Sequence, residues 1–243
     1  MEKQVTVKKN SFEFKQFSIN QENCAMKIGT DGVLLGAWFD ASNADNILDI
    51  GTGTGVIAIM AGQRNQNAKV HAVEIEEKAF GQAQQNMQAA KWNDRLEVFH
   101  NSIQDYCKSC KDKYDVILSN PPFFSGGTLS ANNERNDFRH TVKLPNGDLL
   151  RAAQALLSPT GKFCVILPFM EGLRFKERAA SYKLFCTRMT KVKSVADGRT
   201  ERVLLQFELT DKPIVEDKLT IAAKEREFTD EYVNLTKDFY LKM

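Results

Sequence analysis

Residues 119–123, Ser-Asn-Pro-Pro-Phe, place hydrogen-bond acceptors and an aromatic ring in one rigid turn. They follow the apolar run 114–118, which predicts a buried parallel strand, and open α/β sheets bind ligands at the ends of such strands. Each proline fixes φ at about −65° and removes a backbone donor. The Asn120 amide, the Pro121 carbonyl and the Phe123 ring would therefore complement an exocyclic amine on a planar base, which offers two N–H donors and a π face. We predict these three as catalytic residues; the alternative is a proline-stiffened turn with a core Phe.

A second candidate site is the glycine-rich turn 51–55, Gly-Thr-Gly-Thr-Gly, between the apolar run 47–50 and an apolar helix. Such a turn lets the backbone approach a ligand and presents N–H groups at the helix start. The sixth position is Val56, so the spacing departs from the Gly-x-Gly-x-x-Gly of dinucleotide-binding folds. The turn therefore predicts a different nucleotide-like cofactor. The residues of this turn predicted to hold the cofactor are Asp49, Gly51, Thr52, Gly53 and Gly55, and Asn120 of the first turn is predicted to contact it as well.

Two further positions are predicted to complete the cofactor site. Glu74 ends the predicted strand 69–73 about 20 residues after the turn, where a carboxylate can accept the hydroxyls of a ribose. Thr30 or Asp31 is a candidate N-cap for a short helix whose first N–H groups could face an anion. The alternatives are a surface charge at Glu74 and a plain capped helix at residue 30.

Strands and helices alternate along the chain, which predicts a Rossmann-like α/β sandwich with a mostly parallel sheet. No Pro/Gly/Ser-rich linker divides the 243 residues, so we expect one domain over 1–243, with an N-terminal extension at 1–45 and a core at 46–243. The extension has strand patterns at 5–7 and 12–14. The later predicted elements are a helix at 76–91, a strand at 95–99, a helix at 148–157, a turn at 159–161, a strand at 162–168, a helix at 171–182, a hairpin of 184–195 with 202–210, and a helix from residue 229.

Composition excludes several classes of protein. Hydrophobic residues make up 42% and charged residues 26%, and no apolar run approaches the ~18 residues of a membrane span. The N-terminus lacks a secretory signal, and the five cysteines, an odd number, argue against a disulfide framework, so we expect a cytoplasmic protein. Cys107 and Cys110 have no second ligand pair at zinc spacing, so we expect no metal. We expect a monomer, with a weak dimer left open.

Positive charge is local, because the whole chain carries only +2. Segment 183–202 has six cationic and two acidic residues, and its predicted hairpin would present this charge to RNA phosphates. The long polar loop 125–146 follows the Asn-Pro-Pro-Phe turn and is also predicted to contact RNA. A solvated hairpin and a solvated loop are the alternatives. The residues predicted to bind RNA are Arg135, Arg139, His140, Lys143, Arg188, Lys191, Lys193 and Arg199.

The glycine turn resembles the S-adenosylmethionine loop of class I methyltransferases, and Asn-Pro-Pro-Phe resembles the motif of N6-adenine and N5-glutamine amino-methyltransferases. Over nearly its whole length the chain is similar to the tRNA1(Val) adenine-N6-methyltransferase family. The stretches that carry this resemblance are 14–17, 24–27, 30–38, 120–123, Arg139-His140 and 235–243.

This resemblance implies S-adenosylmethionine as the cofactor and the adenosine 3′ of the anticodon, position 37 of a valine tRNA, as the substrate. It also implies an antiparallel hairpin that closes the sheet and a target base that swings out of its loop. Where the family often has an acid for the cofactor's adenine amine, this chain has Ser102 followed by Ile103. That contact would fall to the Ser102 hydroxyl or to backbone groups.

Two other functions fit part of the pattern. A glutamine-N5 methyltransferase that acts on protein shares the Asn-Pro-Pro-aromatic turn, but it predicts a substantial N-terminal recognition domain, and only about 45 residues precede the first core strand here. A regulator that binds S-adenosylmethionine and RNA without catalysis would have the same cofactor turn. Transfer of a methyl group to RNA distinguishes this regulator from an enzyme.

Overall fold

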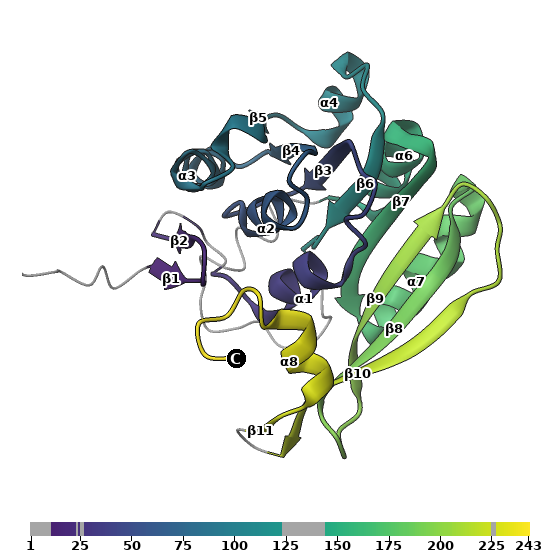
Figure 1. The fold of residues 1–243 in the computed structure, drawn as a ribbon. Coiled ribbons are helices and arrows are strands. Elements are labelled where there is room, and N and C mark those ends of the chain that lie inside the picture. Colours follow the sequence, from purple (N-terminus) through teal and green to yellow (C-terminus); the bar gives the residue numbers. More distant parts are fainter. Residues whose placement is uncertain (1–10, 23, 25–26, 123–143, 225–226) are drawn as a thin grey trace, which may run out of the picture.

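A nine-stranded sheet forms the centre of the fold (Figure 1). The computed structural model describes the chain outside residues 1–10, 23, 25–26, 123–143 and 225–226. The strands are β3 (Asn46–Ile50), β4 (Lys69–Glu74), β5 (Leu96–His100), β6 (Tyr114–Ser119), β7 (Leu157–Pro168), β8 (Phe185–Val195), β9 (Thr200–Glu208), β10 (Val215–Lys224) and β11 (Glu227–Phe228). Their order is β11-β10-β8-β9-β7-β6-β3-β4-β5.

Strands β3 to β7 pair in parallel, whereas β9 runs antiparallel to both β7 and β8. This confirms the predicted Rossmann-like α/β sandwich, mostly parallel with an antiparallel C-terminal hairpin. Strand β10 is an addition that we did not predict, and it pairs in parallel with β8. The carboxyl ends of β3 to β8 and β10 therefore share one edge of the sheet with the first residues of β9.

Helices cover both faces of the sheet, which explains the apolar runs of the central strands (Figure 1). Ile47 and Val116 belong to one core cluster, and Leu48 and Ile117 belong to the other, as the alternation of side chains along a strand requires. The first cluster includes residues of α1 (Thr30–Trp38), α2 (Val56–Arg64), α3 (Glu77–Ala89) and α8 (Asp230–Thr236). The second includes residues of α4 (Ile103–Ser109), α6 (Asn146–Leu156) and α7 (Phe169–Ala179).

The two ends of the described chain pack against each other. Strands β1 (Ser11–Glu13) and β2 (Ser18–Asn20) form a short antiparallel hairpin, and Phe14 bridges to Tyr240 of the C-terminal tail. The backbone N–H of Lys15 donates to Phe239 O at 2.7 Å. The predicted strand at 12–14 corresponds to β1, whereas the one at 5–7 lies outside the described residues.

One predicted turn is wrong. Residues 159–161 lie within β7, where the pairing with β6 shifts register between Tyr114 and Val116. A Cβ on Gly161 would lie 2.7 Å from the Tyr114 carbonyl oxygen, so the glycine lets the two backbones approach closely at this irregularity. The Pro-Thr-Gly sequence favours a turn in isolation, but here it forms the irregular part of a strand.

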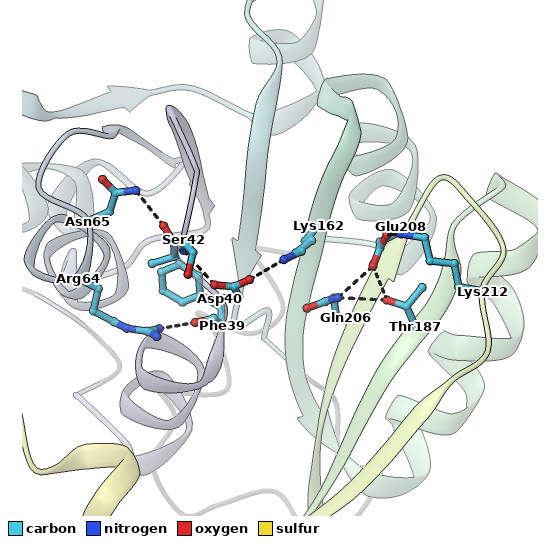
Figure 2. Close-up of polar contacts among 11 residues, drawn as sticks. Phe39, Asp40, Ser42, Arg64, Asn65, Lys162, Thr187, Gln206, Glu208 and Lys212 are labelled. Carbon is cyan, nitrogen blue, oxygen red and sulfur yellow. Dashed lines mark hydrogen bonds and ion pairs between the residues drawn. The ribbon is translucent and has the colours of Figure 1, made fainter.

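A polar network fastens the C-terminal end of α1 to β7 (Figure 2). Asp40 pairs with Lys162 at 2.6 Å and accepts a 3.0 Å hydrogen bond from the Ser42 N–H. The Lys162 hydrogen bond, followed by that of Ser42, holds the pKa of Asp40 well below its usual range. Lys162 lies opposite Val116, early in β6, so the ion pair holds the C-terminal end of α1 near the amino ends of these strands. The N-terminal end of α1 therefore points toward the carboxyl edge of the sheet.

Within the described residues, no helix is long and apolar enough to cross a membrane. In that part of the chain, no three His, Cys, Asp or Glu side chains gather where they could hold a metal ion.

Candidate active site

The carboxyl ends of three neighbouring strands bring the predicted cofactor and catalytic residues together. Strand β3 lies between β4 and β6, with Ile50 opposite both Val73 and Ser119. The Ser119 hydroxyl donates a 2.9 Å hydrogen bond to the Ile50 carbonyl, which fixes the end of β6 beside the glycine turn. Ligands of open α/β sheets bind at such an edge.

The glycine turn adopts a backbone that only glycine accommodates without strain. Gly51, Gly53 and Gly55 all have positive φ, at +73°, +58° and +84°. A Cβ on Gly51 or Gly53 would meet no atom within 4 Å, so these two residues face open space. Gly55 caps α2 and approaches Ala83 of α3, where a Cβ would lie 3.5 Å away. The turn is therefore packed on one side and open to a ligand on the other.

Asp49 lies directly beneath this turn and is fully buried. Its Oδ2 accepts a 2.6 Å hydrogen bond from the Thr52 hydroxyl, while Oδ1 has no hydrogen-bond partner among the described residues. Burial raises the pKa of Asp49 to about 7; the Thr52 hydrogen bond opposes the rise and the charge of Glu74 adds to it. The site thus contains a carboxyl group that can titrate near neutral pH.

Glu74 is 5% exposed and is held entirely by backbone donors. Its Oε2 accepts from the Gly53 N–H at 2.8 Å, and Oε1 accepts from the N–H groups of Ile75 and Glu76 at 2.9 and 3.0 Å. Burial raises its pKa, and these three hydrogen bonds oppose the rise. A carboxylate has about four acceptor positions, so one position on Oε2 is left for a ligand hydroxyl.

Asn120 follows β6 at the same edge and is half-buried. A Cβ on Gly32 of α1 would lie 3.9 Å from Asn120 Nδ2, so the first turn of α1 lies against the predicted catalytic turn. Within the described part of the chain, the Asn120 amide makes no hydrogen bond. Pro121 is buried, and Phe123 lies outside the described residues.

The predicted cap of α1 is wrong. The N-cap is Gly29, with no side-chain hydrogen bond, and Thr30 is the first helical residue and is exposed. The Asp31 carboxylate accepts a 2.9 Å hydrogen bond from Arg202 Nε of β9. An ion pair with β9 therefore orients Asp31, which could otherwise have capped the helix.

Ser102 is the N-cap of α4. Its hydroxyl oxygen accepts a 3.1 Å hydrogen bond from the Asp105 N–H, and its hydroxyl donates to Asp105 Oδ2 at 2.8 Å. Ile103 is buried, so its side chain contributes to the core. The Ser102 hydroxyl proton is thus already engaged, and the backbone groups of 101–103 remain the predicted contact for an adenine.

The structure separates the predicted RNA-binding cations. The Arg188 guanidinium lies 4.3 Å from the centre of the Trp38 ring and pairs with Asp217 at 3.2 Å. Lys191 pairs with Glu216 at 2.9 Å, and Lys193 donates to the Ala196 carbonyl at 3.3 Å. Arg199 is exposed in the turn between β8 and β9. The residues at 135, 139, 140 and 143 lie outside the described part of the chain.

Three residues at this edge escaped sequence reasoning. The buried Asn86 amide of α3 exchanges two hydrogen bonds with the Asn20 backbone and donates a third, of 2.8 Å, to the Thr54 carbonyl. Ile75 is 51% exposed directly after Glu74. Burial, followed by the charges of Glu74 and Glu76, raises the pKa of the Cys24 thiol to about 12, which places Cys24 close to these carboxylates. Of these three residues, only Ile75 had a signal in the sequence, namely an apolar residue directly after the acid that ends a strand. Asn86 and Cys24 reach the edge only through tertiary packing.

Comparison with known proteins agrees with this arrangement. The model of the methyltransferase small domain family matches residues 24–173. Proteins named tRNA1(Val) (adenine(37)-N6)-methyltransferase from Trichodesmium erythraeum and Christiangramia forsetii are 47% and 42% identical to this chain, each over 96% of it and 98% of the relative.

Two solved structures with the same fold share little sequence with this chain. A predicted O-methyltransferase from Agrobacterium tumefaciens has a TM-score of 0.69 at 16% identity, covering 86% of this chain and 96% of that one. A glycopeptide N-methyltransferase crystallised with S-adenosylmethionine has a TM-score of 0.55 at 11% identity, covering 76% and 100%. At these identities the likeness shows the fold alone.

The parallel sheet, its antiparallel closing strands and the glycine turn define a class I methyltransferase. The full-length similarity narrows this class further. The chain belongs to the tRNA1(Val) (adenine(37)-N6)-methyltransferase family.

Proposed function

We propose that this protein transfers a methyl group from S-adenosylmethionine to N6 of adenosine 37 in tRNA1(Val). The observation that carries the proposal is the position of Asn120 at the end of β6, beside a glycine turn whose backbone faces open space. The names of its relatives supply the specific tRNA and position.

The residues at the carboxyl edge fit the proposed cofactor. Gly51 and Gly53 leave room for a ligand against the backbone, and Oε2 of Glu74 has one acceptor position for a ribose hydroxyl. The exposed Ile75 side chain offers an apolar surface next to that carboxylate, where a planar base can pack. The buried Asp49 carboxyl accepts a hydrogen bond from the Thr52 hydroxyl beneath the turn and so supports the turn's shape. When bound, S-adenosylmethionine supplies a methyl group activated by its sulfonium.

Asn120 and Pro121 would make the adenine amine reactive. The lone pair of that nitrogen is delocalised into the ring, so the site must favour the tetrahedral form that attacks the methyl group. Acceptors at Asn120 Oδ1 and the Pro121 carbonyl would do so by holding both N–H groups as the geometry changes. No strong base is required, because the departing proton becomes acidic once the nitrogen bears the new methyl group.

The target base must leave its loop to reach these acceptors. Stacking on the ring of Phe123 would hold the extruded adenine. The cations of 135–143 and those of the β8–β9 hairpin other than Arg188, which lies on Trp38, would hold RNA phosphates. We also propose that the whole chain works as one domain and as a monomer. The free state of all five cysteines supports a reducing, cytoplasmic location.

The test combines purified protein with total tRNA from a strain that lacks the gene. Nucleoside mass spectrometry should show N6-methyladenosine appearing in the valine tRNA, and a tRNA with guanosine at position 37 should remain unmodified. Methyl transfer to a protein glutamine instead would support the N5-glutamine alternative. Binding of cofactor and tRNA without any transfer would support the regulator alternative, and either result would overturn the proposal.

A further inference from the structure

The added strand β10 assembles a cluster of lysines that is scattered in the sequence. It pairs in parallel with β8, so that Lys218 lies opposite Lys191 and Thr220 lies opposite Lys193. On the other side of β8, Thr200 at the start of β9 lies opposite Lys193. Three adjacent strands therefore contribute to one patch of the sheet.

All these side chains project from the same face. Alternate residues of a strand share a face, so Lys191 and Lys193 lie on the face of Met189, which packs in the core cluster of α7. Thr190 and Val192 point the opposite way, toward α1, since Thr190 accepts a 2.8 Å hydrogen bond from the Trp38 indole and Val192 belongs to the cluster of α1. Arg188, stacked on Trp38, also belongs to that opposite face.

The lysines line an open surface pocket of about 310 Å³. Its lining, which we call the lysine pocket, consists of Lys191, Lys193, Ala196, Thr200, Lys218 and Thr220. Glu216 pairs with Lys191 from outside this lining, whereas Lys218 is exposed and makes no ion pair within the described residues. Ammonium groups and threonine hydroxyls with no carboxylate among them match the oxygens of a phosphate in charge and hydrogen bonding.

The lysine pocket faces the same edge of the sheet as the candidate active site. Lys193 and Thr200 lie beyond the level of Pro168, the last residue of β7, because Arg202 is opposite Pro168. Strands β8 and β10 are three and four positions from β6 in the sheet order. At about 4.8 Å per strand, the pocket is roughly 14–19 Å along the edge from Asn120. A polynucleotide with one base at Asn120 can span this distance with a few nucleotides.

We propose that the lysine pocket binds a backbone phosphate of the RNA substrate a few nucleotides from the methylated adenosine. This inference rests on the proposed tRNA substrate and adds Lys218, Thr200 and Thr220 to its binding surface. The contact is to phosphate alone, so it contributes affinity and register without sequence preference.

The test measures how tRNA affinity depends on salt in variants of the full-length protein. Lys218→Gln and Lys193→Gln should each reduce the slope of log affinity against log salt by about 0.7–0.9, the value for one phosphate contact. Between about 50 and 200 mM salt, the fold-loss of affinity of each variant would then be about one third of the fold-loss of the wild type. Lys218→Arg should retain the slope. Lys69→Gln, an equal charge change at the opposite edge of the sheet, is the matched control.

The proposed phosphate contact would be overturned if Lys218→Gln and Lys193→Gln had the same slope as Lys69→Gln. It would also be overturned if Lys218→Arg, which keeps the charge, reduced the slope as much as Lys218→Gln does. Methylation of valine tRNA by the wild type is measured on the same samples. If methylation occurs and the slopes match the control, only the pocket is wrong. If binding follows the predicted slopes but no methyl group is transferred, the pocket stands as an RNA site and the proposed reaction is wrong.

Discussion

The backbone N–H of Gly53 donates a 2.8 Å hydrogen bond to Oε2 of Glu74, so the glycine turn after β3 and the acid after β4 form one unit. The second oxygen of Glu74 holds the two N–H groups that lead into α3. Glu74 therefore has two roles in the proposed site. It shapes the turn that receives the cofactor, and its remaining acceptor position would contact the ribose.

Replacement of Glu74 by alanine should weaken S-adenosylmethionine binding by roughly 1.5–3 kcal/mol, the range for a hydrogen bond to a charged group. The variant should also melt at a lower temperature, because three backbone donors lose their partner. Titration calorimetry gives the affinity. Glu77→Ala removes an exposed carboxylate from the same region and serves as the control. Equal affinities of the two variants would argue against the ribose contact.

Asn120→Ala should lower kcat about 10²–10³-fold, by analogy with loss of one donor from an oxyanion hole, and should change cofactor affinity much less. The reason is that the Asn120 acceptor acts mainly as the amine becomes tetrahedral. Single-turnover methylation of the tRNA measures the effect, and a thermal melt shows that the variant is folded. Full turnover by a folded Asn120→Ala enzyme would remove the proposed chemistry.

Titration of Asp49 should make the ligand-free protein less stable as the pH rises through neutrality. Its pKa is about 7 in the folded protein and ~3.9 when unfolded, so the folded state binds more protons between these values and the free energy of unfolding falls with pH. This group alone should make the protein about 2–3 kcal/mol more stable at about pH 5 than at about pH 8. Denaturation at both pH values measures the difference.

The control for this titration is Asp49→Asn, which cannot titrate. His71, whose pKa is lowered mainly by burial, changes stability in the opposite direction over part of this range. The comparison between wild type and Asp49→Asn cancels such contributions. An identical pH dependence of the two proteins would show that Asp49 is ionised throughout this range.

Asn86 should act as a positioning residue for the glycine turn. Asn86→Ala leaves the Asn20 backbone and the Thr54 carbonyl without partners, so the free energy of unfolding should fall by roughly 2–4 kcal/mol. Because Thr54 belongs to the turn, KM for the cofactor should rise more than kcat falls. Asn93→Ala, which removes an exposed amide, is the control. A loss of stability with unchanged kinetics would limit Asn86 to a structural role.

Arg188 should differ from Lys193 although the two cations share strand β8. Arg188→Ala removes a cation–π contact with Trp38 and should reduce stability by about 0.5–2 kcal/mol while leaving the salt dependence of tRNA binding unchanged. Lys193→Gln should instead leave the stability unchanged and reduce the salt dependence of tRNA binding. A reduced salt slope in Arg188→Ala would place RNA on the α1 face of the hairpin.

Sequence alone predicted the parts of this protein that depend on local patterns. The glycine turn and the turn at Asn120 follow apolar runs too short for helices, and parallel strands align their carboxyl ends, so residues 49–55, 74 and 120 were expected at one edge. The alternation at 184–195 and 202–210 likewise predicted the β8–β9 hairpin. Each of these inferences needs only neighbouring residues and the geometry of a parallel sheet.

Only the tertiary structure decided what partners the side chains have. Strand β10 begins with mostly exposed residues, three of them charged at 216–218, and lacks a strong apolar alternation, because it lies toward the edge of the sheet, where it pairs with β8. Its pairing set the register that joins Lys218 to Lys191 and gave Arg188 an acidic partner. The hydrogen bonds of Asn86 with the Asn20 backbone join residues 66 positions apart, and the ion pair of Asp31 with Arg202 joins residues 171 positions apart. Such contacts depend on how the elements pack, which local periodicity does not encode.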